Sequence, residues 1–242
     1  ARVAIVGNPH PPRPIRIATY NVRHGAPPAR GVDRRGLVHT LRSLDVDLLA
    51  LQEVDVRVRR SRYLNLGRTT SRATGLHVEF ARATSIGRFG QYGIALATRT
   101  PPHALQRVAL PSFGMEARVA ILARVRLGDM LATVAATHLH NRREPALAQL
   151  DVVIEALLER PGPHLLLGDL NLGPDPVMQR LEAAGFTTVD SPPTFPTQRP
   201  TRRIDWIAGR GVDLRAPLVP PVWSSDHLPL IVTVAPAATV GA

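Results

Sequence analysis

The sequence predicts an α/β fold in which two packed β-sheets are flanked by helices. Towards both ends of the chain, short apolar runs of strand character alternate with amphipathic helical stretches. The centre instead holds four strand-like runs with short polar or Pro/Gly breaks between them, which favours neighbouring, largely antiparallel strands. A chain of 242 residues with 44% hydrophobic content can bury one full core. The mixture of strand–helix alternation and consecutive antiparallel strands argues against a doubly wound parallel sheet.

The N-terminal part predicts a strand, a helix and a second strand. Residues 15–20 and 48–52 are apolar runs of strand type. Between them, apolar side chains recur at helical spacing at Leu37, Val38, Leu41 and Leu44. The central strands are predicted at residues 93–98, 104–110, 117–125 and 131–137. Later in the chain, a short buried strand is predicted at 165–167, directly before Gly-Asp-Leu-Asn, and two late strands at 203–208 and 230–234.

Two more helices are predicted in the second half of the chain. The first covers residues 145–158, because Pro145 suits a first helical turn and an apolar stripe follows it. The second has Asp175 as its N-cap, Pro176 at its first position and Gly185 as its stop. We therefore expect a single catalytic domain over residues 15–234, an extended arm over the proline-rich residues 1–14, and a loose tail over residues 235–242.

Composition excludes several classes of protein. There is no cysteine, so neither disulfides nor a thiolate metal site can form. No run approaches the roughly 18 apolar residues that span a bilayer, so we expect a soluble protein without integral membrane association. The sequence leaves open whether the protein is cytoplasmic or exported.

The net charge of +11 indicates an anionic partner, because a positive field attracts phosphates. All 30 basic residues are arginine, so part of this charge reflects a compositional bias of the chain. Six arginines nevertheless crowd one polar stretch, at positions 57, 59, 60, 62, 68 and 72. Guanidinium groups suit phosphate oxygens, so we predict Arg60 and Arg62 as substrate-binding residues, with a solvated loop as the alternative.

Polar residues that bind metals or move protons lie at the ends of the predicted strands. They are Asn21, Glu53, His138, Asp169 with Asn171, Asp205, and Asp226 with His227. Each has a structural alternative: Asn21, Asp169 and Asn171 could form turns, Glu53 could lie on the surface, His138 could be a semi-buried histidine, and Asp205 could pair with Arg202 or Arg203. As a set they predict a site, since loops at one rim of a sheet sandwich gather residues distant in sequence.

These residues lie in motifs that resemble the endonuclease/exonuclease/phosphatase superfamily, which includes deoxyribonucleases, apurinic endonucleases and neutral sphingomyelinases. The resemblance covers residues 15–234, and the order of the motifs is that of the family. The motifs are Tyr-Asn-Val at 20–22, Leu-Gln-Glu-Val at 51–54, Thr-His-Leu at 137–139, Gly-Asp-Leu-Asn at 168–171, Ile-Asp-Trp at 204–206 and Ser-Asp-His-Leu-Pro at 225–229.

The resemblance implies a four-layer α/β sandwich of two mixed sheets and metal-assisted hydrolysis of a phosphate ester. Glu53 would bind a hard cation, Mg²⁺ or alternatively Mn²⁺, with Asn21 and Asp226 beside it. Asp169 and His227 would orient or deprotonate the attacking water, and Asp205 would hold the tautomer of His227. The remaining roles concern phosphate: Asn171 would donate to a phosphate oxygen, and His138 would contact the scissile phosphate.

Two family-level questions stay open in the sequence. Glu116 and Arg118 match a Glu-x-Arg pattern of some bacterial members, and both a bridge behind the site and a plain ion pair explain them.

The second open question is the substrate, for which the sequence allows a nucleic acid, a lipid or another small phosphodiester. The arginines favour nucleic acid, whereas Trp206 and Trp223, the two tryptophans, offer no obvious stacking platform. A catalytically inactive phosphate- or nucleic-acid-binding module is the alternative function, and we expect a monomer.

Overall fold

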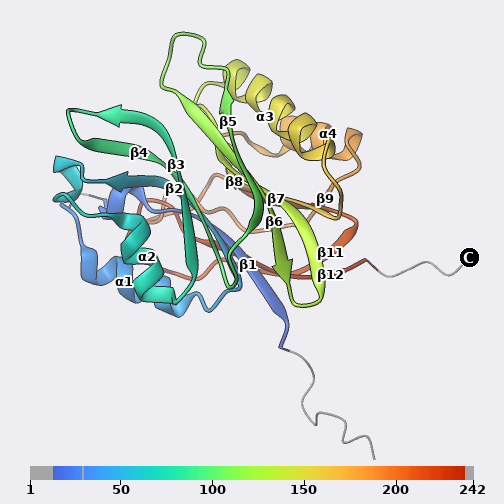
Figure 1. Ribbon diagram of the computed structural model, residues 1–242, viewed down its shortest axis with the longest axis horizontal. Helices are drawn as coiled ribbons and strands as arrows, with labels where there is room; N and C mark the ends of the chain where they lie inside the picture. The colour runs from blue at the N-terminus through green and yellow to red at the C-terminus, as the bar shows by residue number, and fades with distance from the viewer. Residues whose placement is uncertain (1–12, 29, 238–242) are drawn as a thin grey trace, which may run out of the picture.

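Figure 1 shows the computed structural model of the protein, which describes residues 13–28 and 30–237. Its strands form two mixed six-stranded sheets. Sheet A contains, in spatial order, β11 (Val212–Leu218), β12 (Leu230–Pro236), β1 (Ile15–Asn21), β2 (Leu48–Val56), β4 (Gly90–Thr98) and β3 (His77–Ile86). Sheet B contains β5 (His103–Leu110), β6 (Arg118–Leu127), β7 (Met130–His138), β8 (His164–Asp169), β10 (Asp205–Arg210) and β9 (Thr187–Thr188).

Four α-helices of the described chain complete the layers. Helices α1 (Arg34–Ser43) and α2 (Leu66–Thr74) belong to the apolar cluster on the outer face of sheet A. Helices α3 (Arg143–Leu158) and α4 (Pro174–Ala183) cover the outer face of sheet B, as the two sides of Figure 1 show. The predicted fold, two mixed sheets flanked by helices in four layers, is confirmed.

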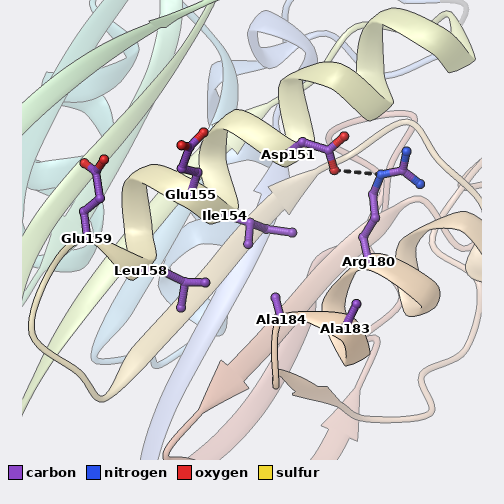
Figure 2. A pocket seen from close by; sticks show the side chains of 8 residues that line it. All are labelled: Asp151, Ile154, Glu155, Leu158, Glu159, Arg180, Ala183 and Ala184. Atoms are coloured by element: carbon purple, nitrogen blue, oxygen red, sulfur yellow. Dashed lines mark hydrogen bonds and ion pairs between the residues drawn. The ribbon is translucent and has the colours of Figure 1, made fainter.

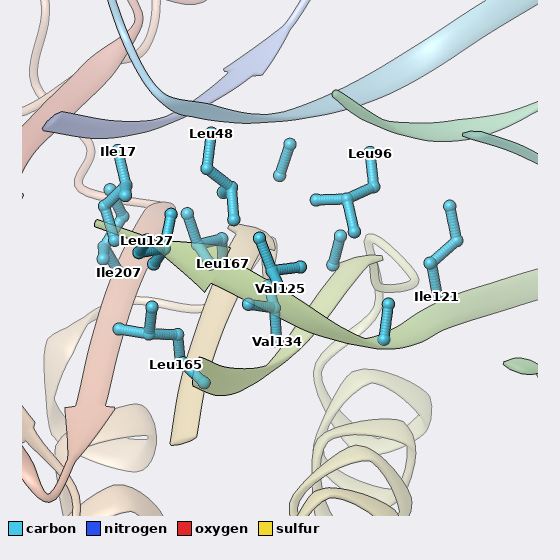
Figure 3. Packing of buried hydrophobic residues seen from close by; sticks show 14 of the residues in the cluster. Ile17, Leu48, Leu96, Ile121, Val125, Leu127, Val134, Leu165, Leu167 and Ile207 are labelled. Carbon is cyan, nitrogen blue, oxygen red and sulfur yellow. The ribbon is translucent and has the colours of Figure 1, made fainter. Parts of the chain in front are cut away.

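The largest apolar cluster lies between the two sheets (Figure 3). Ile17 and Leu48 of sheet A pack there with Val134, Leu165 and Ile207 of sheet B. Successive residues of a strand point to opposite faces, so every second residue of each strand belongs to this inner layer. The same alternation directs Asn21, His138, Asp169 and Asp205, at the strand termini, towards the space between the sheets.

Several local predictions need correction. The predicted central run crosses between sheets, because β4 belongs to sheet A and β5 to sheet B. Helix α4 has Gly173, not Asp175, at its N-cap, since Pro174 takes the first helical position and Asp175 lies in the first turn. Helix α2 and strands β3, β9 and β11 were not predicted. Asn65, the N-cap of α2, accepts a hydrogen bond from the Arg68 backbone N–H, and Gly75 in a left-handed conformation ends the helix. The helix was missed because arginines make this segment polar, although capping residues mark both of its ends.

The ends of the predicted domain fall close to the limits of the described chain. Strand β1 begins at Ile15, and β12 includes Ala235 and Pro236. Residues 1–12 of the predicted arm and 238–242 of the predicted tail lie outside the described residues. Within the described chain, none of the helices has the length and hydropathy required to span a membrane.

Candidate active site

Asn21 links residues from the two sheets. Its side-chain amide donates to Glu53 Oε1 at 3.2 Å and to Asp169 Oδ2 at 3.0 Å, and its Oδ1 accepts the Arg23 backbone N–H at 3.0 Å. Asn21 is the last residue of β1 and is 1% exposed, so its position is fixed by the sheet. Through its amide, Asn21 holds the two carboxylates in place, which corresponds to the hydrogen-bonding role of the two roles predicted for it.

Glu53 lies in a β-bulge inside β2, rather than at the strand end that the sequence predicted. Strict alternation would send Glu53 to the helical layer, where Leu49 and Leu51 pack. The pairing with β4 shifts register between Leu51 and Val54, so Val54 takes that place instead. Glu53 adopts a left-handed backbone with φ of 55° and turns towards Asn21. The bulge therefore re-aims one carboxylate, a common use of bulges beside sites.

His227 lies between two buried carboxylates. Its Nδ1 is 2.8 Å from Asp205 Oδ2, and its Nε2 is 3.6 Å from Asp169 Oδ2. Asp205 also accepts a hydrogen bond from the Thr194 hydroxyl, and it does not pair with Arg202 or Arg203. Because β8 and β10 pair with Asp169 directly opposite Asp205, the sheet itself sets the spacing of the two carboxylates.

Burial and mutual repulsion perturb the pKa values of this group. Burial and the Asp205 carboxylate raise the pKa of Asp169 to about 7, although the charge of His227 opposes this. Burial alone would lower the pKa of His227, but Asp205 and Asp169 outweigh it and raise the pKa to about 10. At neutral pH the imidazole is therefore charged, and Asp169 titrates near the physiological range.

His138 is held by Arg118, for which the sequence allowed either a bridge behind the site or a plain ion pair with Glu116. Arg118 Nη1 donates to His138 Nδ1 at 2.9 Å, and Arg118 Nη2 contacts Glu116 Oε2 at 3.3 Å. A guanidinium has no acceptor, so Nδ1 must accept, and the proton of the neutral ring lies on Nε2. Burial, followed by the charge of Arg118, holds the pKa of His138 well below its usual range. The bridge behind the site thus fixes the tautomer of His138.

Asn171 combines the turn and the site that the sequence offered as alternatives. Its backbone N–H donates to Asp169 Oδ1 at 2.9 Å, and its φ is 54°, so the Asp-Leu-Asn segment is a tight turn. Its side-chain amide lies 3.2 Å from His138 Nε2 and donates to the Leu139 carbonyl at 3.1 Å. The turn places the amide beside His138.

The Ser-Asp-His segment before β12 is tied to the end of β1. The Ser225 hydroxyl donates to the Asn21 carbonyl at 2.7 Å, and the Ser224 hydroxyl lies 2.8 Å from the Tyr20 hydroxyl. Asp226 lies between these anchors and His227, and its Oδ2 is 3.2 Å from Arg23 Nε. The two serines were not predicted as functional, although their position directly before Asp226 and His227 was visible in the sequence.

The donor set fits a hard divalent cation. Burial opposes the charge of Glu53, but neighbouring His24 and His138 and the amide of Asn21 lower the pKa of Glu53 to about 2. Two of the buried side-chain atoms without a hydrogen-bond partner belong to this neighbourhood: Asp205 Oδ1, and His24 Nδ1, which lies 3.7 Å from Glu53 Oε2. Unsatisfied buried atoms at one place indicate a ligand site. Ionised oxygen ligands are those that Mg²⁺ prefers.

A second group of possible ligands lies next to Glu53. One atom each from Asp169, Asp205 and His227 lie within 4.8 Å of one another, a spacing that could hold a metal ion. Some of these residues are already hydrogen-bonded to each other, however, because Asp205 Oδ2 bonds both His227 Nδ1 and the Thr194 hydroxyl. We therefore treat this triad as the proton-handling part of the site.

The predicted substrate arginines lie outside this cluster. Arg60 Nε and Nη2 each bond Asp55 at 2.9 Å, so its guanidinium neutralises a fully buried carboxylate. Arg62 is exposed on the same loop with φ of 52°. A separate groove of about 620 Å³ lies between α3 and α4 and is crossed by the Asp151–Arg180 ion pair (Figure 2). It contains no predicted site residue and lies beside the outer face of sheet B.

Fold and site together define an α/β sandwich with a charged acid–base cluster where its two sheets meet. The family model for the endonuclease/exonuclease/phosphatase family matches residues 18–227. The chain therefore belongs to this family, as the motifs predicted. Members of the family include nucleases, phosphatases and phosphodiesterases, which are typically metal-dependent hydrolases of phosphoester bonds.

Solved structures agree on the fold. An endonuclease/exonuclease/phosphatase from Beutenbergia cavernae has a TM-score of 0.74 at 21% identity, over 92% of this chain and 71% of that chain. The human nocturnin catalytic domain with bound sulfate has a TM-score of 0.72 at 19% identity, over 93% and 95% of the two chains. A mannosyl-6-phosphatase from Bacteroides thetaiotaomicron has a TM-score of 0.71 at 15% identity, over 91% and 99%. None of the curated proteins matches the sequence significantly.

Proposed function

We propose that this protein is a Mg²⁺-dependent hydrolase of phosphodiesters. The observation that carries the proposal is a connected polar cluster that residues from both sheets form, most of them at strand ends and Glu53 in the bulge of β2. Asn21 joins Glu53 to Asp169, and Asp169 faces the His227–Asp205 pair at 3.6 Å. An ionised carboxylate, a carboxylate with a raised pKa and an oriented imidazole are the parts that hydrolysis by an activated water requires.

Glu53 and Asp226 would hold the metal ion, with Asn21 orienting Glu53. When bound, Mg²⁺ would supply Lewis acidity towards a phosphoryl oxygen and stabilise the charge that develops there. The side chains of Glu53 and Asp226 are both 26% exposed, so their oxygens are accessible from solvent. The 3.2 Å contact between Arg23 and Asp226 balances part of the local negative charge.

Asp169 is the proposed base. His227 carries a proton at neutral pH, so it acts as a charged donor to the phosphate or the attacking water rather than as the proton acceptor. Asp205 keeps Nδ1 of that ring engaged and leaves Nε2 facing the reaction site. A base with a pKa of about 7 is well matched to neutral pH, because it is both deprotonated and basic enough.

His138 and Asn171 are proposed to bind the phosphate. The Nε2–H of His138 donates without changing charge, because Arg118 fixes the neutral tautomer. The Asn171 amide lies beside it at 3.2 Å, so the two side chains present polar groups to the same space. The names of two structural relatives, a sulfate-bound nocturnin domain and a mannosyl-6-phosphatase, are consistent with an anion site on this fold.

Hydrolysis of bis-p-nitrophenyl phosphate with Mg²⁺, followed by release of p-nitrophenolate, tests the proposal. Glu53→Gln should remove the metal-dependent rate, and Asp169→Asn should reduce kcat by about 10²- to 10⁴-fold, the usual contribution of a general base. Both variants should keep the wild-type circular dichroism spectrum.

Two exposed carboxylates provide matched controls. Glu159→Gln at the end of α3 and Asp129→Asn in the β6–β7 turn lie away from the cluster and should retain the wild-type rate. Wild-type protein that is inert on phosphomonoesters and phosphodiesters with both Mg²⁺ and Mn²⁺ would overturn the proposal. Retained binding of phosphate or oligonucleotide in that case would favour the inactive binding module.

A further inference from the structure

A groove of about 660 Å³ lies beside the loop that follows β2 and the turn between β3 and β4. Its position is tied to the candidate active site, because β2 also carries Glu53. The residues that line it include Arg57, Arg59, Arg60, Tyr63, Arg88 and Phe89. The groove therefore combines arginines with two aromatic rings.

Both aromatic rings are turned towards solvent. Tyr63 is 67% exposed and Phe89 is 70% exposed, although large aromatic side chains usually bury most of their surface. Arg88 lies over the Phe89 ring, with its guanidinium carbon 5.1 Å from the ring centroid. The sequence argument for substrate considered tryptophans and did not identify this pair of rings.

The loop that carries Tyr63 is crossed by backbone hydrogen bonds in spite of its exposure. The backbone N–H groups of Arg57 and Tyr63 bond the carbonyls of Leu64 and Val58, both at 2.9 Å. Arg62 and Tyr63 have φ of 52° and 58°, a left-handed conformation that is uncommon for non-glycine residues. Hydrogen bonds across the loop maintain this conformation. Tyr63 is thus held outward before any ligand arrives.

The arginines of the groove differ in their availability. Arg60 is held by Asp55 and stacks over Tyr92, with 5.1 Å between its guanidinium carbon and the ring centroid. Arg57, Arg59 and Arg88 are exposed, and no ion pair within residues 13–28 and 30–237 involves them. No acidic residue lines the groove. Three exposed guanidinium groups outside these ion pairs therefore line the same groove as the two rings.

A chain of contacts connects the groove with the catalytic cluster. Arg60, which lines the groove, stacks on Tyr92. The Tyr92 hydroxyl lies 3.5 Å from Arg118 Nη1, which in turn donates to His138 at 2.9 Å. The groove is thus linked to His138 through the side chains of Tyr92 and Arg118.

We propose that the Tyr63–Phe89 groove binds unpaired bases of a single-stranded nucleic acid, while Arg57, Arg59 and Arg88 contact its phosphates. The inference rests on the proposed phosphodiester hydrolysis and names the substrate class of that site. Aromatic rings among basic residues are the combination by which proteins bind single strands, since every base offers a π-face. Bases inside a duplex are stacked on each other and would not reach the rings.

The shape of the surface favours this occupant over a membrane. A lipid surface calls for a convex apolar tip, whereas these rings border a hollow and alternate with charged side chains. Replacement of each ring by leucine separates the two cases, because leucine keeps apolar surface and removes the π-face.

The experiment measures fluorescence anisotropy of a labelled twelve-nucleotide oligothymidylate with EDTA, so that no metal-dependent cleavage occurs. Wild-type protein should bind the single strand more tightly than a duplex of equal length. Tyr63→Leu and Phe89→Leu should each weaken binding about 5- to 100-fold, the range for loss of one stacked base, and Tyr63→Phe should retain it. Arg57→Ala should reduce the slope of log K against log salt by about 0.7.

Arg126→Ala is the matched arginine control, because Arg126 is exposed at the far end of β6 from Arg118. It should leave the affinity for the strand unchanged. Equal binding of single strand and duplex, or leucine variants with wild-type affinity, would overturn the proposal, as would ring-dependent binding to phosphatidylserine vesicles without strand binding. Hydrolysis of bis-p-nitrophenyl phosphate without strand binding would refute this inference alone, whereas strand binding without hydrolysis would refute the proposed function alone.

Discussion

At the scale of single residues, the chemistry depends on how neighbours set the charge of each buried group. Asp205 lies beside Nδ1 of His227 and Asp169 beside Nε2, so one positive charge on the ring interacts with two carboxylates. Arg118 has the reverse effect on His138, where a guanidinium excludes a proton from Nδ1. Two histidines a few ångströms from the same carboxylate, Asp169, are therefore expected to carry different charges at neutral pH.

The raised pKa of His227 predicts a pH-dependent stability of the metal-free protein. The folded state binds the His227 proton more tightly than the unfolded state, whose pKa is near 6.5. The resulting stability is complete below about pH 6.5 and is lost as pH rises towards the folded pKa of about 10. In EDTA, the free energy of unfolding should fall by on the order of 1 kcal/mol per pH unit between about pH 7 and 10.

Urea unfolding across this pH range measures the effect. His227→Gln should flatten the profile, because glutamine keeps polarity without titrating. His39→Gln, an exposed change on α1, should leave the slope as in the wild type. An equal slope in wild type and His227→Gln would show that another group is responsible.

At the scale of elements, residue patterns predicted most of the strands but missed β3, β9 and β11, and they failed where backbone geometry departs from regular alternation. The apolar period identified β1, β7 and β8, and their terminal polar residues lie where that period directs them. The same rule would bury Glu53 among the helices, and only the bulge of β2 corrects it. A bulge depends on pairing with β4, which is distant in sequence, so a local pattern could not reveal it. The polar composition of residues 57–72 likewise concealed α2.

The loop after β2 predicts a structural role for Arg60. Asp55 is fully buried, and Arg60 supplies both of its charged hydrogen bonds. Arg60→Ala should destabilise the protein by about 2 kcal/mol, below the roughly 3–5 kcal/mol of a fully buried pair because the Arg60 side chain is 44% exposed. The melting temperature should fall by about 4–8 °C.

Arg59→Ala is the comparison, because Arg59 is exposed on the same loop and outside the ion pairs of the described chain. It should change the melting temperature little. The double variant Asp55→Asn/Arg60→Ala should recover part of the loss, since no unpaired charge remains buried. Wild-type stability of Arg60→Ala would mean that Asp55 finds another partner, and Arg60 would then be available to substrate as the sequence predicted.

At the scale of the whole molecule, the site exists only when the two sheets are packed together. Glu53 and Asn21 belong to sheet A, whereas His138, Asp169 and Asp205 belong to sheet B. The inner apolar layer ends where these residues begin, so packing of Ile17 against Leu167 and Ile207 positions the polar groups. The sequence predicted which residues meet, through motifs in family order. It could not give their hydrogen-bond partners, because these depend on the relative placement of the sheets.

This arrangement predicts that metal binding stabilises the entire fold. An ion that binds only the folded state adds RT ln(1 + [L]/Kd), which is about 1.4 kcal/mol at ten times the Kd and about 3–6 °C in melting temperature for a domain of this size. Mg²⁺ titration of the melting temperature should therefore show a saturable rise. Glu53→Gln should abolish the rise, and Asp205→Asn should preserve it, because Asp205 is hydrogen-bonded to His227.

The opposite result would be a rise lost in Asp205→Asn and kept in Glu53→Gln. It would mean that the ion binds at the group of Asp169, Asp205 and His227, whose ligand atoms lie within 4.8 Å of one another. Asp169 would then be a metal ligand rather than the base. The same titration thus decides which group of residues binds the metal ion.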